Sequence, residues 1–200
     1  MKKSFLIGLL ICLCLVSVSF AWRADKQLLQ EIKDKKAQVS ANPNSALAHF
    51  DLAITYAYTN HIQEGWDELK KVEALDPTFR KTGLALYITK VNLDPQDWKL
   101  RFRLAFAYYF NQDRKSAIRE LDNVLILDPY NVWAYGYIAL LYGELNETDK
   151  AMDYTLRGLK IDSNVAALHL LLAEGYNRKG NKWGTMAEGM EALRLRALGF

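Results

Sequence analysis

The side chains that could do chemistry are scattered through the 200-residue chain. Its three histidines, His49, His61 and His169, lack the His-x-x-x-His spacing that places two zinc ligands on one face of a helix. His61 follows Asn60 in an expected turn, where we expect its ring to be solvated. The histidine spacing predicts no metal site.

Other catalytic patterns are also missing from the sequence. It contains no Gly-x-Ser-x-Gly nucleophile elbow and no glycine-rich loop of the kind that holds phosphate. The acidic pairs Asp67-Glu68 and Glu147/Asp149 lie at expected helix starts, where each acid complements the helix dipole by about 0.3–1 kcal/mol. We therefore expect a protein that is not an enzyme and uses no cofactor.

The first 21 residues have the pattern of a cleaved secretory signal. Lys2 and Lys3 precede an apolar run over residues 5–18, and Ser19 and Ala21 are small residues at the positions that a signal peptidase reads. The run is shorter than the ~20 residues of a membrane-spanning helix. The sequence predicts export to the periplasm or the extracellular space; the alternative is an uncleaved N-terminal membrane anchor. A lipid anchor is disfavoured, because no small residue precedes Cys12 or Cys14.

Removal of this segment would change the chemistry of the chain. It would remove both cysteines, Cys12 and Cys14, and with them any disulfide or thiolate ligand. The formal net charge would fall from +3 to +1, because Lys2 and Lys3 are the only charged residues in the segment. A nearly balanced charge argues against nucleic acid or anionic lipid as the partner, and no stable membrane span would remain.

A 34-residue period runs through the rest of the chain. Pro43 and Pro77 are 34 residues apart, and so are Pro95 and Pro129. Three of these prolines end a Leu-Asp-Pro tripeptide, and a fourth copy reads Ile-Asp-Ser at residues 161–163. Proline cannot continue a helix and disfavours helical angles in the residue before it. Each copy therefore predicts the end of a helix.

Between these stops, an aliphatic residue, an alanine and a tyrosine recur on one helical face. The alanine lets a neighbouring helix approach closely, and the larger side chains fill the space beside it. The recurring positions are Leu52, Ala53 and Tyr56; Leu104, Ala105 and Tyr108; Ile138, Ala139 and Tyr142; and Leu172, Ala173 and Tyr176. Short polar or glycine residues mark the expected turns, at Asn60, Gln112, Asn146 and Gly180. His49 and His169 fall at equivalent positions of two copies, which favours a packing role for both.

With these markers the sequence resembles the tetratricopeptide repeat (TPR) family over roughly residues 44–200. The resemblance implies an all-α fold, a right-handed superhelical stack of antiparallel helix pairs in which each pair buries its apolar face against the next. The expected divisions are a signal peptide (1–21), a capping helix (22–43) and a repeat domain (44–200). Its units are residues 44–77, 78–95, 96–129, 130–163 and 164–200.

Two units depart from the pattern. Residues 78–95 form half a unit, whose Gly83 and Tyr87 match a second helix, so we expect one extra helix that turns the stack. The last unit keeps helical spacing but loses the register of the repeat, and we expect it to cap the stack with Arg194 and Arg196 towards solvent.

The resemblance further implies an inner groove lined by the first helices of the units. Aromatic and arginine side chains dominate binding patches, and a contiguous apolar patch marks a partner site. The predicted groove residues are Phe50, Ile54, Lys99, Phe102, Arg103, Phe106, Tyr109, Trp133 and Tyr137. The alternative is that this aromatic strip is core.

Lys99 and Arg103 lie where some family members grip a peptide carboxylate, but Phe50 and Ile54 stand where that clamp needs lysine and asparagine. The expected function is a non-enzymatic protein–protein interaction scaffold of the cell envelope, which binds a peptide or a partner helix in the aromatic concave groove. The alternative is a small-molecule or lipid carrier with an apolar pocket between helices at residues 78–95.

Overall fold

The computed structural model describes residues 26–199, and this part of the chain is helical with no strand. The predicted signal segment lies outside the described residues. The ten helices are α2 (Lys26–Ala41), α3 (Ala46–Ala57), α4 (Ile62–Leu75), α5 (Phe79–Leu93), α6 (Trp98–Phe110), α7 (Arg114–Leu127), α8 (Val132–Glu144), α9 (Thr148–Ile161), α10 (Ala166–Arg178) and α11 (Lys182–Ala197).

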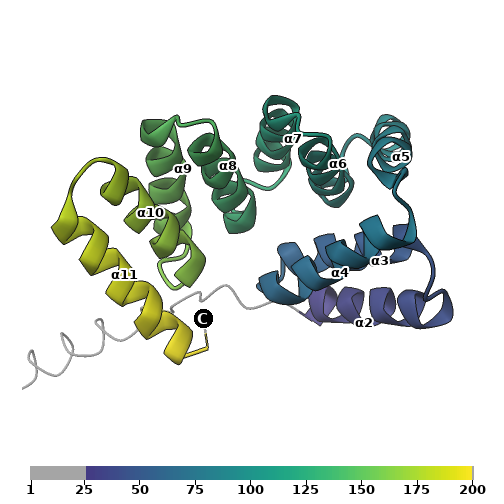
Figure 1. The fold of residues 1–200 in the computed structure, drawn as a ribbon, viewed down its shortest axis with the longest axis horizontal. Coiled ribbons are helices and arrows are strands. Elements are labelled where there is room, and N and C mark those ends of the chain that lie inside the picture. Colours follow the sequence, from purple (N-terminus) through teal and green to yellow (C-terminus); the bar gives the residue numbers. More distant parts are fainter. Residues whose placement is uncertain (1–25, 200) are drawn as a thin grey trace, which may run out of the picture.

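Successive helices pair as the repeat predicts. The pairs are α3/α4, α6/α7, α8/α9 and α10/α11; α8/α9 stacks on α6/α7, and α10/α11 stacks on α8/α9 (Figure 1). The helices α4, α5, α7 and α9 end immediately before an aspartate of the Leu-Asp-Pro or Ile-Asp-Ser tripeptides. The prediction of an all-helical stack of pairs is confirmed.

The turns inside the pairs have the chemistry that their residues indicated. Asn60, Gln112 and Asn146 have φ angles of 61°, 62° and 59°, and Gly180 has a φ of 73°. The left-handed conformation ends each first helix; glycine adopts it freely and asparagine tolerates it, and Gln112 adopts it as well. Side-chain caps begin several helices: Asp113 caps α7 and Asn181 caps α11 after such turns, and between α5 and α6 Asp97 accepts hydrogen bonds from the backbone N–H groups of Lys99 and Leu100.

Small residues allow the helices of a pair to cross closely. Ala105 and Ala139 are buried, and a Cβ atom on Gly65 would lie 3.1 Å from the carbonyl oxygen of Ala53. A larger side chain at such a position would push the two helices apart. The aliphatic and aromatic residues beside these positions form one core cluster that runs from α3 to α10.

The single helix α5 interrupts the alternation of pairs. It packs mainly against α6 and has little contact with α3 or α4, while α3 also reaches past it to α6. Figure 1 shows the result: α2, α3 and α4 run across the view, in a different direction from α6 to α9. We call α2, α3 and α4 the N-terminal unit. The expected extra helix is present, and the stack changes direction there.

At the other end, Arg194 and Arg196 are exposed on α11, as expected. The same helix also exposes several large apolar side chains. Within residues 26–199, no helix combines the length and the apolar character needed to cross a bilayer.

Candidate partner-binding groove

Most of the predicted groove residues are buried. The buried members are Phe50, Ile54, Phe102, Arg103, Phe106 and Trp133, whereas Lys99, Tyr109 and Tyr137 are half-buried. The expected exposure of the six buried side chains is therefore not observed. The physical reason is that α3 lies over the face of α6 that would otherwise line the groove.

Aromatic side chains pack directly against one another across this interface between α3 and α6. The ring of Tyr58, at the end of α3, meets Phe102 edge-on at 5.3 Å, and Phe50 lies 5.9 Å from Phe110 between ring centroids. The hydroxyl of Tyr137 on α8 donates a 3.2 Å hydrogen bond to the carbonyl of Ala57. The strip thus joins the N-terminal unit to α6 and α8, which is the core alternative for most of its residues.

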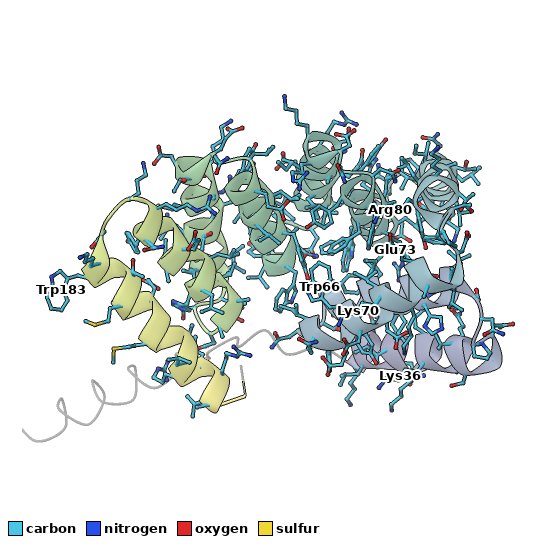
Figure 2. The ribbon with its side chains drawn as sticks, viewed as in Figure 1. Lys36, Trp66, Lys70, Glu73, Arg80 and Trp183 are labelled. Carbon is cyan, nitrogen blue, oxygen red and sulfur yellow. The ribbon has the colours of Figure 1, made fainter. Side chains whose placement is uncertain are left out.

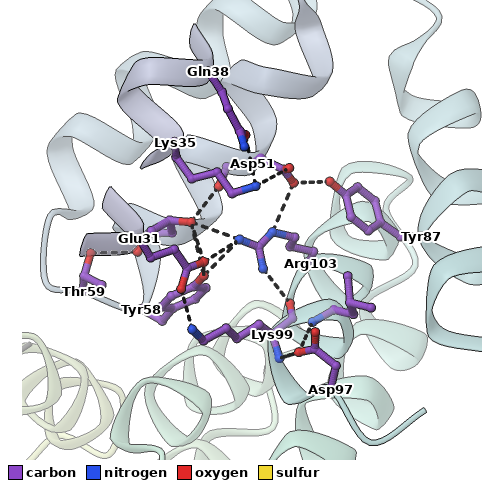
Figure 3. A network of polar contacts seen from close by, with 12 residues as sticks. Glu31, Lys35, Gln38, Asp51, Tyr58, Thr59, Tyr87, Asp97, Lys99 and Arg103 are labelled. Atoms are coloured by element: carbon purple, nitrogen blue, oxygen red, sulfur yellow. Dashed lines mark hydrogen bonds and ion pairs between the residues drawn. The ribbon is translucent and has the colours of Figure 1, made fainter. Parts of the chain in front are cut away.

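Arg103 is the polar centre of this junction (Figure 3). Its side chain is only 6% exposed, and its guanidinium donates to Glu31 on α2 at 2.9 Å and to Asp51 on α3 at 3.1 Å. It also donates to the hydroxyls of Thr55 and Tyr58, each at 3.0 Å. One cation on α6 therefore binds two carboxylates from two helices of the N-terminal unit.

Neighbouring groups complete the network. Lys99 donates to Glu31 at 2.5 Å, Lys35 donates to Asp51 at 2.9 Å, and the hydroxyl of Tyr87 on α5 donates to Asp51. Lys99 and Arg103 thus already contact the carboxylates of their own chain. A peptide carboxylate would have to displace Glu31 to reach them, which argues against the carboxylate-clamp arrangement.

The network keeps its acids ionised and its phenols neutral. Burial alone would raise the pKa of Glu31, but hydrogen bonds from Lys99 and Tyr58 and the charge of Arg103 lower that pKa from 4.5 to about 2. Burial also opposes ionisation of Asp51, and Arg103, Tyr87 and Lys35 nevertheless lower its pKa. Burial raises the pKa of Tyr58 and of Tyr87, so both remain hydrogen-bond donors.

A hollow remains open between the N-terminal unit and the later pairs. Its volume is about 270 Å³, and its walls come from α4, α8 and α10. The principal lining residues are Ile62, Trp66, Trp133, Tyr137, Leu140 and Leu170. All six are apolar or aromatic, and Trp66 and Leu170 are exposed.

This hollow continues along α8 and α10 into a smaller and more polar one. The second hollow measures about 90 Å³ and shares Leu140 and Leu171 with the first. Arg178 on its edge donates to Glu174 at 2.7 Å and to the carbonyl of Gly143 at 2.7 Å. We call the two hollows together the concave groove: it is apolar at the α4 end and polar at the other.

Of the predicted groove residues, the structure brings Trp133 and Tyr137 to the concave groove. Sequence reasoning missed Ile62 and Trp66, because both lie on the second helix of their unit, which faces away from the groove in a regular stack. It also missed Glu31 and Asp51. The available signal was Arg103 itself, since a cation between Phe102 and Leu104 on a packed helix needs carboxylate partners.

The histidines have structural roles in two equivalent places. His49 lies between Glu68 of α4 and the carbonyl of Pro43, and His169 lies 2.6 Å from Glu188 of α11 and 2.9 Å from the carbonyl of Ser163. Each ring is buried, as its predicted packing role requires, and it also links the two helices of its pair through a polar contact. His61 is half-buried against Tyr56, where we expected it to be solvated. Within residues 26–199, no group of three or more His, Cys, Asp or Glu residues is placed to hold a metal ion.

The space around α5 differs from the pocket expected for a carrier. Between α4, α5 and α6 the cavity holds about 20 Å³, because Phe50, Phe79 and Phe110 fill it. A hollow of about 310 Å³ between α3 and α5 is open to solvent and is bordered by the polar residues Asn44, Asp76 and Thr82. Neither is an enclosed apolar pocket of the size that ligands of a few hundred Å³ require.

Comparison with solved structures agrees with this architecture. YrrB, described as a TPR protein with an unusual peptide-binding site, superimposes with a TM-score of 0.54 at 13% identity, over 83% of this chain and 94% of YrrB. The chain has the tetratricopeptide-repeat fold. A MamA RS-1 double mutant gives a TM-score of 0.56 at 14% identity over 86% of each chain. No family model and no curated protein sequence matches the chain significantly.

Replacing Arg103 tests the junction. Arg103→Met would leave Glu31 and Asp51 partly buried with less compensation, and we expect a loss of about 3–5 kcal/mol in the free energy of unfolding. The matched control is Arg80→Met, because Arg80 pairs with Glu73 on the exposed surface; it should change the stability by less than about 1 kcal/mol. Urea unfolding followed by circular dichroism measures both, and equal effects would contradict the role of Arg103.

The lowered pKa values predict acid sensitivity. The folded-state pKa of Glu31 lies below its unfolded value, so its stabilisation, up to about 3 kcal/mol, is complete above pH 4.5 and is lost as the pH falls towards 2. The difference in unfolding free energy between wild type and Glu31→Gln should therefore be large at pH 6 and should shrink by pH 3. The exposed substitution Glu73→Gln should differ little from wild type at either pH. A Glu31→Gln difference independent of pH would contradict the assignment.

Proposed function

We propose that the protein is a non-enzymatic interaction scaffold that binds a segment of another protein in the concave groove. The observation that carries this proposal is the apolar hollow of about 270 Å³, in which Trp66 and Leu170 are exposed beside Trp133 and Tyr137. Aromatic side chains around a concave apolar site are the usual anchors of a partner, because they desolvate a large area at low conformational cost.

The shape of the groove indicates what kind of segment it would bind. One large apolar side chain fits the hollow between α4, α8 and α10, and the flanking residues would extend along α8 and α10 towards Glu174 and Arg178. A peptide or an amphipathic partner helix has this combination of one apolar anchor and polar flanks. The peptide-binding site named for YrrB supports this proposal by analogy of fold alone.

A lipid or small-molecule carrier is the second candidate. The observation that favours it is the same hollow, whose principal lining side chains offer no charge to an incoming ligand. An acyl chain would make apolar contacts with these lining side chains, but it would make no contact with the polar end of the concave groove. The test of the groove is therefore designed to separate the two candidates.

The groove proposal predicts a site-specific contact. A photo-cross-linking amino acid at position 170 should capture a partner protein in living cells, whereas the same residue at position 156 on α9 should not. Leu170 and Leu156 are similarly exposed, at 44% and 42%, but only Leu170 lines the hollow. With the captured partner purified, Leu170→Lys should weaken binding by about 10-fold or more and Leu156→Lys should not, because a charge would enter an apolar anchor site.

Two results would contradict protein binding at the groove. One is equal cross-linking from positions 170 and 156. The other is a palmitate titration in which the tryptophan fluorescence saturates in wild type but not in Leu170→Lys, while position 170 captures no protein. That second result would support the carrier.

We further propose that the protein is exported and works in the cell envelope, in the periplasm or outside the cell. The support is the charged start, the apolar run and the small residues that end at Ala21. Mass spectrometry of the protein from the envelope fraction should find Trp22 at its N-terminus. An intact Met1 in that fraction would favour the membrane-anchor alternative, and recovery of the protein from the cytoplasm alone would contradict export.

A further inference from the structure

Two opposite faces of helix α11 are apolar: an inner face that is buried in the last pair and an outer face that is exposed. Its inner residues, Ala192 and Leu195, are buried in the last pair. Its outer face exposes Trp183 by 79%, Met186 by 50%, Met190 by 63% and Leu193 by 67%. Figure 2 shows Trp183 pointing away from the rest of the fold. A helix that caps a solenoid normally has a polar outer face, and this face of α11 is apolar instead.

The four exposed residues form one straight stripe. Their spacings of three, four and three are those of successive a and d positions in a heptad, which line the seam between two paired helices. A stripe of this kind on a surface helix matches a second helix better than it matches a flat surface. It therefore indicates what shape of partner would cover it.

The order of the residues indicates that the partner helix can be α11 itself. Trp183 and Leu193 lie five positions on either side of residue 188, and Met186 and Met190 lie two positions on either side. In an antiparallel pair centred at residue 188, Trp183 would meet Leu193 of the second copy, and Met186 would meet Met190. These are the a-to-d layers of an antiparallel helix pair, and each layer joins a long side chain to another apolar one.

Small residues flank the same centre. Ala187 and Gly189 lie one position on either side of residue 188, and a Cβ atom on Gly189 would meet no other atom within 4 Å. Two backbones can therefore approach closely at the middle of the stripe. Towards the ends, Lys182 would come opposite Arg194 of the second copy, but Arg194 already pairs with Glu191 in its own helix. The ion pair between Arg194 and Glu191 would reduce the repulsion between Arg194 and Lys182 of the second copy.

We propose that the outer face of α11 binds a second copy of this chain, so that two antiparallel α11 helices form a two-fold symmetric dimer. A two-fold interface uses the same patch on both copies, which is what the symmetric stripe provides. The exposed apolar area of the stripe is of the order of 500 Å² per copy, less than the about 800 Å² of a standard interface. We therefore expect a reversible dimer with a dissociation constant of about 10 μM.

The proposed dimer would leave the concave groove free. The stripe lies on α11, whereas the groove residues come from α4, α8, α9 and α10. Each dimer would then present two grooves, which would raise the apparent affinity for a partner that carries two binding segments. The dimer itself does not depend on the groove having a partner.

Sedimentation velocity of the exported protein tests this proposal. Between 1 and 200 μM, roughly bracketing the expected constant, wild type should change from monomer to dimer. The variant Met186→Glu/Met190→Glu should remain mostly monomeric up to about 200 μM, with a dissociation constant raised at least about 50-fold, because charges would be buried in the seam. The control Ile126→Glu places the same charge on α7, where Ile126 is 76% exposed, and should dimerise like wild type.

Single cysteines test the antiparallel register. An oxidised mixture of Met186→Cys and Met190→Cys proteins should form a disulfide between the two different variants, mapped by mass spectrometry to residues 186 and 190. Each variant alone should cross-link far less at these positions. Cross-linking of Met186→Cys with itself would indicate a parallel pair and overturn the proposed dimer.

Three further results would overturn the proposal. Wild type could remain monomeric throughout the concentration range, or the double glutamate variant could dimerise normally while circular dichroism shows it folded. Monomeric wild type could instead bind phosphatidylcholine/phosphatidylglycerol vesicles, with binding lost in Met190→Glu. In that case the stripe would be a membrane contact.

Discussion

The buried guanidinium of Arg103 sets the position of the N-terminal unit, α2 to α4. Arginine remains charged in any protein environment, so burying it requires carboxylates at hydrogen-bond distance. Glu31 and Asp51 meet this requirement from two helices of the N-terminal unit, at 2.9 and 3.1 Å. The ion pairs are directional, and they add one defined orientation to an aromatic interface that many orientations could bury. In this way α2, α3 and α4 are fixed against α6.

The odd helix α5 makes that position possible. In an uninterrupted stack, α4 would pack against the first helix of the next unit, and the aromatic face of α6 would line an open groove. Because α5 occupies that place, the N-terminal unit turns, and Tyr58 at the end of α3 covers Phe102. The same turn brings Ile62 and Trp66 of α4 opposite α8 and α10. One additional helix therefore closes the expected groove and opens another.

The concave groove and the outer stripe of α11 have different shapes. The concave groove consists of two adjoining hollows lined by α4, α8, α9 and α10, and it suits a single anchoring side chain with polar neighbours. The outer stripe of α11 is a straight ridge and suits another helix. A scaffold with both would recognise a segment of one protein at the groove and pair with its own copy at the end of the stack. Stacked repeats allow this separation because each unit contacts only its neighbours.

The sequence by itself determined the helices, their ends and their pairing. Proline stops, the polar and glycine turns at Asn60, Gln112, Asn146 and Gly180, and the alanines at close crossings act within one unit, so a 34-residue period reveals them. Only the tertiary structure decided which side of each helix is covered. Glu31 meets Arg103 across 72 residues, and Trp66 meets α8 and α10 only because α5 turns the chain. The direction of that turn depends on how all the neighbouring side chains pack together, and no local pattern in the sequence records it.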